Sequence, residues 1–248
     1  MQYRFAVEKQ DYKDYAGGRV FYSLPGQPAL PVRLAIEIFQ RCWAYRASTE
    51  PAILYDPCCG GAYHLSVLGY WQGQRVTEIV ASDVNTAVLP LAQRNLSLLT
   101  PEGLARRTAE LQQLYDAYQK PSHAEALVSV ARLQARLGRY LPGQAIVTQV
   151  FAADVMDADS VVVGLNGRAV DIVLSDIPYG WLTTWQAEDP EKSPVWQMLE
   201  TLRPILAPDA VVAIAADKAQ KVAHEGYVRL EKFQVGKRRI WLGRSLPH

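Results

Sequence analysis

Val170-Asp171-Ile172-Val173-Leu174-Ser175-Asp176-Ile177-Pro178-Tyr179-Gly180 is the stretch of this sequence that best indicates its fold. Its first six residues have the length and apolar character of a buried strand. An acid, a proline and an aromatic residue follow, and the proline stiffens the turn because its ring fixes φ and it has no N–H. Pro-Tyr-Gly after a strand can also be only a turn that ends the strand.

The composition is that of a folded α/β protein. The 248 residues fit one large domain or at most two small ones, and 49% are hydrophobic, which argues against disorder. The formal net charge is only +1, so a nucleic acid would have to be held by local basic patches. The N-terminus lacks an apolar signal core and no apolar run is long enough to span a membrane, so we expect a soluble, cytoplasmic protein.

The cysteines and histidines do not form a metal-binding pattern. The three cysteines are Cys42, Cys58 and Cys59, an odd number with two adjacent, which matches neither a disulfide framework nor a zinc site. The four histidines are scattered along the chain. We therefore expect no metal, and we interpret Cys58 and Cys59 as small apolar fillers of a tight turn rather than as nucleophiles.

Short β-branched runs alternate with helical stretches, which is typical of a mostly parallel sheet with helices on both faces. Strands are expected near 53–57, 77–82, 146–152, 169–175, 210–215, 227–233 and 238–243. The last two flank Gln234-Val235-Gly236-Lys237 and are predicted to form an antiparallel hairpin at the sheet edge. Helices are expected at 31–46, 61–71, 86–98 and 194–206. The prediction is one domain over residues 1–248, with a seven-stranded sheet and an N-terminal strand and helix extension over 1–50.

Residues 101–141 depart from this alternation and are predicted to form an inserted pair of helices. The break between them is Lys120-Pro121, and Ser122 to Glu125 has the spacing of a capping box. Apolar residues then recur at helical spacing. The basic residues of this insertion are typical of a solvated helix surface, and an RNA-contacting surface is the alternative.

The stretch from Ile53 to Ala62 predicts a ligand site. It is an apolar strand that ends in Asp56 and runs through small residues into a helix, where Gly60 and Gly61 let the backbone approach a ligand. It matches the dinucleotide fingerprint G-x-G-x-x-G poorly, which disfavours a pyrophosphate. Asp56 suits a positively charged group, and S-adenosyl-L-methionine (SAM) has an ammonium and a sulfonium.

Four aspartates in series close or follow successive strands, and ligands of open α/β sheets bind at these carboxyl ends. The carboxylate of Asp83 can accept hydrogen bonds from ribose hydroxyls, and Asp154 or its neighbouring amide can meet an adenine amino group. The predicted SAM-binding residues are Asp56, Pro57, Cys58, Gly60, Gly61, Asp83, Val84, Asp154, Val155 and Asp176.

The chemistry expected at this edge is methyl transfer to a nitrogen of a nucleic-acid base. Asp176 and the carbonyl of Ile177 can accept hydrogen bonds from the base, and Tyr179 can stack on its ring, so Asp176 and Tyr179 are the predicted catalytic residues. Such a site cannot reach a paired, stacked base, so the target must lie in a loop or be flipped out.

Substrate contacts are predicted at a basic cluster and near the cofactor loop. From Asp217 to Arg244 there are eight basic residues against three acids, and local basic clusters bind the phosphate backbone. A solubilising sheet edge explains this cluster equally well. The predicted substrate-binding residues are Arg33, Pro178, Tyr179, Lys237, Arg238 and Arg239.

Several stretches together resemble a known family. They are Ala16-Gly17-Gly18-Arg19-Val20, Pro31-Val32-Arg33-Leu34-Ala35, Glu37-Ile38-Phe39-Gln40-Arg41, Asp56-Pro57-Cys58-Cys59-Gly60, Ala81-Ser82-Asp83-Val84, Asp154-Val155 and Asp176-Ile177-Pro178-Tyr179-Gly180. The family is the avilamycin-resistance rRNA methyltransferases of the AviRa type, and the resemblance covers essentially the whole chain. It implies a Rossmann-like SAM fold, 23S rRNA or the large ribosomal subunit as partner, a guanine as target, and reduced binding of an orthosomycin antibiotic.

The resemblance has one departure and leaves rival functions open. The family's loop reads Gly-x-Gly after the two cysteines, whereas this chain has Gly60-Gly61-Ala62. Rivals are methylation of tRNA, DNA or a protein amide, and an RNA-binding module that has lost catalysis. A nicotinamide oxidoreductase is disfavoured by the missing glycine fingerprint.

Overall fold

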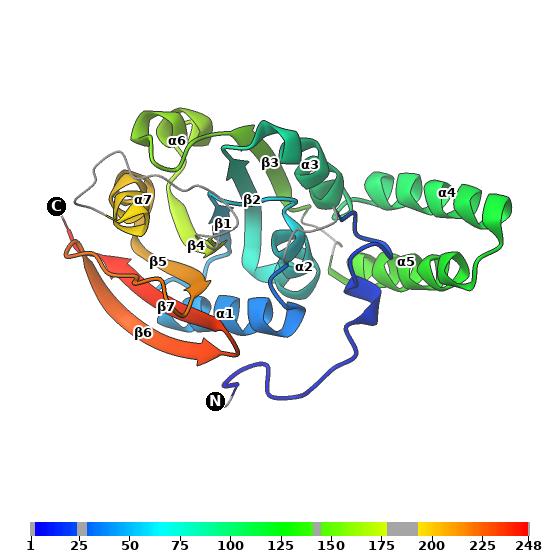
Figure 1. Cartoon of the computed structure of the whole chain (residues 1–248), viewed down its shortest axis with the longest axis horizontal. Helices are drawn as coiled ribbons and strands as arrows, with labels where there is room; N and C mark the ends of the chain where they lie inside the picture. Colours follow the sequence, from blue (N-terminus) through cyan, green and yellow to red (C-terminus); the bar gives the residue numbers. More distant parts are fainter. Residues whose placement is uncertain (1–2, 24–28, 141–144, 178–192, 248) are drawn as a thin grey trace.

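The protein is described by a computed structural model that covers residues 3–23, 29–140, 145–177 and 193–247. Within these ranges seven strands form one sheet in the order β3-β2-β1-β4-β5-β7-β6 (Figure 1). The first five strands of this order pair in parallel, and β7 is antiparallel to both β5 and β6. The strands are β1 (Ala52–Asp56), β2 (Val76–Asp83), β3 (Val147–Ala152), β4 (Val170–Asp176), β5 (Leu206–Asp217), β6 (Tyr227–Val235) and β7 (Arg238–Ser245). The predicted fold class is confirmed.

Helices cover both faces of this sheet. Successive side chains of each strand point to opposite faces, so both faces carry apolar residues that the helices bury. In β1, Leu54 packs in one buried cluster and Tyr55 in another. The first cluster includes residues of α1 (Val32–Tyr45), α2 (Tyr63–Gln72) and α3 (Leu89–Ser97), and the second those of α6 (Ala158–Leu165) and α7 (Pro194–Leu202). Of the helices that the structure describes, none has the length and apolarity required to cross a bilayer.

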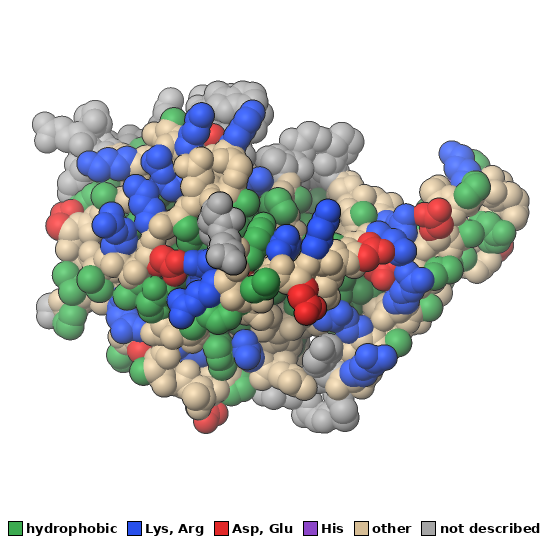
Figure 2. Space-filling view, turned by 90° about the horizontal axis from the view of Figure 1, so that it is seen from below, with side chains coloured by type: hydrophobic (Ala, Val, Ile, Leu, Met, Phe, Trp, Pro, Cys, Tyr) green, Lys and Arg blue, Asp and Glu red, His purple; other side chains and the backbone are tan. Residues whose placement is uncertain are grey.

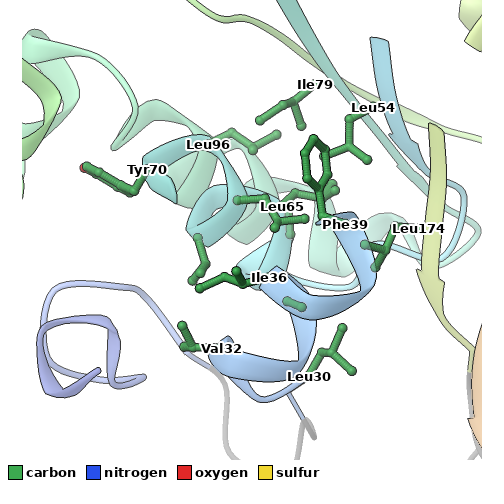
Figure 3. Packing of buried hydrophobic residues seen from close by; sticks show 14 of the residues in the cluster. Leu30, Val32, Ile36, Phe39, Leu54, Leu65, Tyr70, Ile79, Leu96 and Leu174 are labelled. Atoms are coloured by element: carbon green, nitrogen blue, oxygen red, sulfur yellow. The ribbon is translucent and has the colours of Figure 1, made fainter. Parts of the chain in front are cut away.

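The larger cluster joins α1 and α2 to the sheet (Figure 3). Phe39 of α1, Leu65 of α2 and Leu54, Ile79 and Leu174 of the strands are fully buried there. Burying each such side chain contributes about 1.5–3 kcal/mol. This contact sets the position of the segment before α1 and of the loop before α2, and both segments border the functional site.

The inserted helices α4 (Pro101–Tyr118) and α5 (Pro121–Tyr140) project from the body of the domain (Figure 1). The break at Lys120-Pro121 is confirmed, but the predicted capping box is wrong. The carbonyl of Lys120 accepts hydrogen bonds from the amides of His123 and Ala124, which places Ser122 within the first turn. Glu125 instead forms an ion pair with Arg19, at 2.5 Å. The helix begins at Pro121, a residue type favoured at the first helical position, so Ser122 lies inside the helix and cannot be its N-cap.

Helix α6 was not predicted from the sequence. Its three consecutive valines favour a strand by local propensity. The helix begins at Asp157, whose side chain accepts a hydrogen bond from the amide of Asp159, and it ends at Asn166 in the left-handed conformation. These two caps were the signal that sequence reasoning missed.

The terminal hairpin is confirmed and its turn is tighter than expected. Strand β6 ends at Val235 and β7 begins at Arg238, so only Gly236 and Lys237 connect them. Gly236 has φ of +58°, as two-residue hairpin turns of this kind require. The backbone amide of Lys218 donates to the carbonyl of Lys237 and ties the turn to the end of β5.

The N-terminal segment is held by side chains of α1. Fully buried Glu37 accepts hydrogen bonds from the backbone amides of Arg4, Phe5 and Ala6, at 2.7–2.9 Å. Arg33 donates to the carbonyls of Ala6 and Val7. Arg33 therefore holds this segment, and its predicted role in substrate binding stays a prediction. The expected N-terminal strand is reduced, in the described part of residues 3–23, to an isolated bridge and a short 3-10 helix.

Replacing Glu37 by Ala should lower the free energy of unfolding by about 1–3 kcal/mol, because three backbone amides lose their acceptor. Arg41 loses one of its two carboxylate partners and keeps Glu231. Chemical denaturation measures this. Glu8→Ala, which truncates an exposed glutamate of the same segment, is the control and should change stability little. Equal effects of the two changes would contradict the assigned role.

Candidate active site at the carboxyl edge of the sheet

The site lies where the chain connections of the sheet change sides. Strands β1 and β4 are neighbours, yet β1 leads into α2 on one face whereas β4 precedes α7 on the other. Ligands of open α/β sheets bind at such a switch point, beyond the carboxyl ends of the strands. Asp56, Asp83 and Asp176 are the last residues of β1, β2 and β4, and Asp154 comes two residues after β3.

These carboxylates are close enough to influence one another. Burial raises the pKa of Asp83, and the charge of Asp56 raises it further, although the amides of Asn85 and Gly60 act in the opposite direction. Burial and the charges of Asp56 and Asp83 also raise the pKa of Cys58. Its thiol therefore stays protonated, which favours the packing interpretation of the cysteines.

Asp56 stabilises the loop that follows β1. It is fully buried, and its Oδ1 accepts a hydrogen bond from the amide of Cys58, at 3.0 Å. Its Oδ2 lies 3.1 Å from Nε2 of His64, which is also 3.4 Å from the carbonyl oxygen of Leu174. Burial opposes a charged His64, but the Asp56 carboxylate outweighs this and raises its pKa. This carboxylate thus joins β1, β4 and α2.

The glycine loop, Gly60-Gly61-Ala62, is hydrogen-bonded to the end of β2. Gly60 has φ of +50°, and its amide donates to Oδ2 of Asp83, at 2.9 Å. The Oδ1 of Asp83 accepts from the amide of Asn85. A Cβ on Gly61 would lie 2.7 Å from a methyl group of Leu91, so no larger residue fits there without movement. Ala62 follows in the left-handed conformation, with φ of +51°.

Asn95 of α3 is a loop-positioning residue that sequence reasoning missed. Its fully buried side chain donates to the carbonyls of Tyr22 and Gly61, at 3.0 and 2.8 Å, and accepts from the amide of Tyr22. Asn95 therefore joins the N-terminal leader, the segment from Ala16 to Ser23, to the glycine loop. An asparagine in an amphipathic helix gave no signal of this contact.

The remaining predicted cofactor residues differ in exposure. Pro57 and Val155 are buried, whereas Asp154 is exposed and its Oδ1 accepts from the amide of Met156. Val84, directly after Asp83, is 66% exposed. An apolar surface beside carboxylates fits a flat, polar-edged ring such as adenine.

Asp176 is paired with Arg238 of the hairpin. Nε and one terminal nitrogen of Arg238 lie 3.3 and 3.1 Å from the two carboxylate oxygens. The side chain of Asp176 is only 10% exposed. The backbone amide of Ile177 donates to the carbonyl of Ala215, which continues the β4–β5 pairing past the aspartate. The predicted residues Pro178 and Tyr179 lie outside the described residues.

The three consecutive basic residues of the hairpin do not share one patch. Lys237 is exposed in the turn. Arg238 and Arg239 lie on opposite faces of the sheet, as do Ile240 and Trp241 after them, which pack in different clusters. One molecular face nonetheless carries Lys and Arg side chains spread widely over it (Figure 2).

The sheet order, the antiparallel strand β7 and the glycine loop held by strand-end acids define a Rossmann-like methyltransferase. The comparisons with known proteins agree. The chain belongs to the AviRa family of rRNA methyltransferases, whose family model matches residues 1–238.

Two relatives and one more distant structure illustrate the similarity. The chain is 41% identical over 243 residues to a 23S rRNA (guanine(2535)-N(1))-methyltransferase of Streptomyces viridochromogenes, covering 98% of this chain and 96% of that one. It superposes on the rRNA methyltransferase aviRa of the same species with a TM-score of 0.89, at 40% identity and the same coverage. TrmN of Thermus thermophilus shares the fold, with a TM-score of 0.51, 15% identity and coverage of 88% of this chain and 49% of that one.

Ala62→Gly should change the free energy of unfolding by less than about 1 kcal/mol. Relief of the left-handed alanine contributes about 1–2 kcal/mol, whereas the extra chain entropy of an unfolded glycine costs about 0.5–1 kcal/mol and the loss of a fully buried methyl group costs about 0.8 kcal/mol. Gly60→Ala, at the neighbouring left-handed position with open space around it, should lower the free energy of unfolding by up to about 1.5 kcal/mol. Chemical denaturation measures both changes. A gain of stability in Gly60→Ala would contradict this account.

His64→Gln should destabilise the protein in a pH-dependent manner. Because the pKa of His64 is raised on folding, its protonation contributes stability that is fully present below the ordinary value of 6.5 and is lost as pH rises through the raised pKa. The difference in unfolding free energy from the wild type should therefore be largest at acidic pH and shrink as pH increases. A difference independent of pH would show that only packing was lost.

Proposed function

We propose that this enzyme transfers a methyl group from SAM to a guanine of 23S rRNA, at N1. The family membership and the activity of the 41% identical relative support the substrate and the nitrogen. The observation that carries the proposal is Asp176, a largely buried carboxylate at the switch point of the sheet. An enzyme that modifies ribosomal RNA would act in the cytoplasm, and reduced binding of an orthosomycin antibiotic would be one consequence of the modification.

The residues at the carboxyl edge fit SAM. The grouped carboxylates suit its ammonium and sulfonium charges, and the open backbone at Gly60 allows close approach. Asp83 would accept hydrogen bonds from the ribose, and the exposed side chain of Val84 would lie against the adenine. Asp154 and the amide of Val155 would meet the adenine edge. When bound, SAM supplies an electrophilic methyl group.

Asp176 would act on the target base. N1 of guanine carries a proton at neutral pH, so this proton must leave as the nitrogen is methylated. Asp56, Asp83 and Asp154 each accept a hydrogen bond from a backbone amide of the loop that follows them. Asp176 pairs with the side chain of Arg238. Asp176 would accept the N1 proton and pass it to solvent, a contribution of the general-base kind.

The remaining parts of the proposal concern the substrate. Tyr179 would stack on the guanine and Pro178 would stiffen its loop, as proposed from the sequence. Lys237 at the exposed turn would meet the phosphate backbone, whose attraction to basic groups depends on salt.

Asp176→Asn should lower the rate of methyl transfer to ribosomal RNA by about 100-fold or more, because an amide cannot take the N1 proton. Transfer of tritium from labelled SAM measures this, with tRNA, DNA and protein as alternative acceptors. Calorimetry should show SAM binding by the variant within a few fold of the wild type.

Asp159→Asn is the matched control, since Asp159 is an exposed aspartate in the first turn of α6. It should leave transfer unchanged. Transfer by Asp176→Asn at the wild-type rate would refute the role of Asp176. Transfer by the wild type only to tRNA, DNA or protein would refute the substrate.

A further inference from the structure

The terminal hairpin of β6 and β7 divides its side chains between two faces. Ile240 and Phe233 pack in the cluster that contains α1, whereas Trp241 packs in the cluster of α6 and α7. Alternate residues of the hairpin therefore point to opposite sides of the sheet. Glu231 belongs to the α1 side, because its carboxylate forms an ion pair with Arg41 of α1.

A β-bulge in β6 brings two cations to the other face. The register with β7 shifts between Arg229 and Glu231, so Leu230 is an extra residue of this strand. Leu230 packs against the α1 cluster, on the side of Glu231. Arg229 has the orientation of Tyr227, which packs with α6 and α7, and after the bulge Lys232 returns to the same face.

Arg239 of β7 completes a strip of three cations on this face. It pairs across the strands with Gln234, which lies two residues from Lys232 on the same side. Such diagonal neighbours of an antiparallel pair are about 7–8 Å apart. Arg229, Lys232 and Arg239 are called the cationic strip.

No acid of the described residues forms an ion pair with the cationic strip. On the α1 side the cations have counter-charges, since Arg41 contacts Glu37 and Glu231, and Arg238 contacts Asp176. Two residues of the strip are exposed and the third is half-buried. Their mutual repulsion opposes folding, and an anionic ligand laid on this face would relieve it.

Protection of the sheet edge does not account for the whole strip. Edge strands carry charged residues that deter pairing with another chain, and β6 is the edge strand, so Arg229 and Lys232 suit this purpose (Figure 1). Strand β7 is paired with β5 on one side and β6 on the other, so Arg239 has no open edge to protect. A ligand that lies on the face of the hairpin accounts for all three cations.

The strip begins beside the candidate active site. Arg239 and Asp176 lie two strands apart, on either side of Ala215-Ala216 of β5. Neighbouring strands are about 4.8 Å apart, so the two backbones are separated by about 10 Å. From there the strip runs along the hairpin to Arg229, opposite Gly243, which is about 13 Å further along β7.

We propose that the cationic strip binds the phosphate backbone of the RNA strand that carries the target guanine. This inference rests on the proposed function, because it gives the strip and the site the same substrate. A base that leaves its stack to reach Asp176 keeps its neighbours' phosphates outside the pocket. Phosphates on either side of the base would then lie within reach of cations that begin about 10 Å away. The strip keeps Arg239 as a substrate-binding residue and adds Arg229 and Lys232.

The test is the salt dependence of RNA binding by Arg229→Gln, Lys232→Gln and Arg239→Gln. Loss of one phosphate contact should reduce the slope of log K against log [KCl] by about 0.7–0.9 in magnitude. At about 0.1 M KCl the Kd should rise by about five- to eightfold in each variant. Filter binding to transcribed 23S rRNA, in the presence of S-adenosylhomocysteine, measures both quantities.

Two further variants make the result specific. Arg239→Lys keeps the charge, so its slope should stay close to that of the wild type. Arg106→Gln is the matched control, because Arg106 is an exposed arginine of α4 that no acid of the described residues pairs with. Its slope and Kd should not change.

Unchanged slopes in all three strip variants would overturn the proposal. Self-association of Arg229→Gln and Lys232→Gln in sedimentation would in that case assign these cations to edge protection. An effect of Arg106→Gln equal to that of the strip variants would also overturn it. So would binding to phosphatidylserine vesicles that the strip variants lose while their RNA binding stays intact.

The proposed function is tested separately, by methyl transfer with the wild type. A wild type that methylates 23S rRNA, with slopes unchanged in the strip variants, would refute the strip and leave the function standing. A wild type that binds 23S rRNA through the strip without methylating it would refute the function and leave the strip standing.

Discussion

The site depends on one electrostatic constraint, which is that a carboxylate shielded from water must have a donor beside it. Parallel strands bring their carboxyl ends to one edge of the sheet, so the acids that close β1, β2 and β4 crowd together there. Backbone amides bind the first two of these acids, and an arginine side chain binds the third. The identity of the partner indicates what each carboxylate can do.

Two of these acids are used by the protein to build the loop. Asp56 is held by the amide of Cys58 and by His64, and Asp83 by the amides of Gly60 and Asn85. Backbone donors cannot leave, so these carboxylates form a fixed negative support beneath the cofactor loop. A fixed support of this kind costs little reorganisation when a cation binds, which is the basis of electrostatic preorganisation.

Asp176 has a partner of another kind. Arg238 is the first residue of β7, which runs antiparallel to β5, so its guanidinium reaches the carboxyl end of β4 from a distant part of the chain. Its two nitrogens face the two oxygens of the Asp176 carboxylate, so an ion pair between side chains contributes to holding this acid.

The leader and the projecting helices also reach this site. Arg107 of α4 donates to the carbonyls of Arg19 and Val20, and the next residues of the leader are clamped by Asn95, which also holds Gly61. Arg94 and Arg107 both lie over the ring of Tyr22. Residues 19–22 therefore contact both the helical insertion, through Arg107, and the residue that holds Gly61, through Asn95.

The sequence by itself determined the fold class, the seven strands, the strand-end acids, the hairpin and the break at Lys120-Pro121. These features follow from local periodicity and turn chemistry, which act over a few residues. Local signals also failed. The three consecutive valines of α6 lie in a helix, and Ser122 lies within the first turn of α5 rather than at its N-cap.

Only the tertiary structure decided how the polar side chains are paired. Arg238 meets Asp176 across 62 residues, Asn95 meets Gly61 across 34, and Arg33 meets Ala6 across 27. The order of strands and the docking of α1 set these distances. These distances cannot be predicted from a residue's neighbours along the chain, because the packing of the whole domain determines which side chain a buried charge meets.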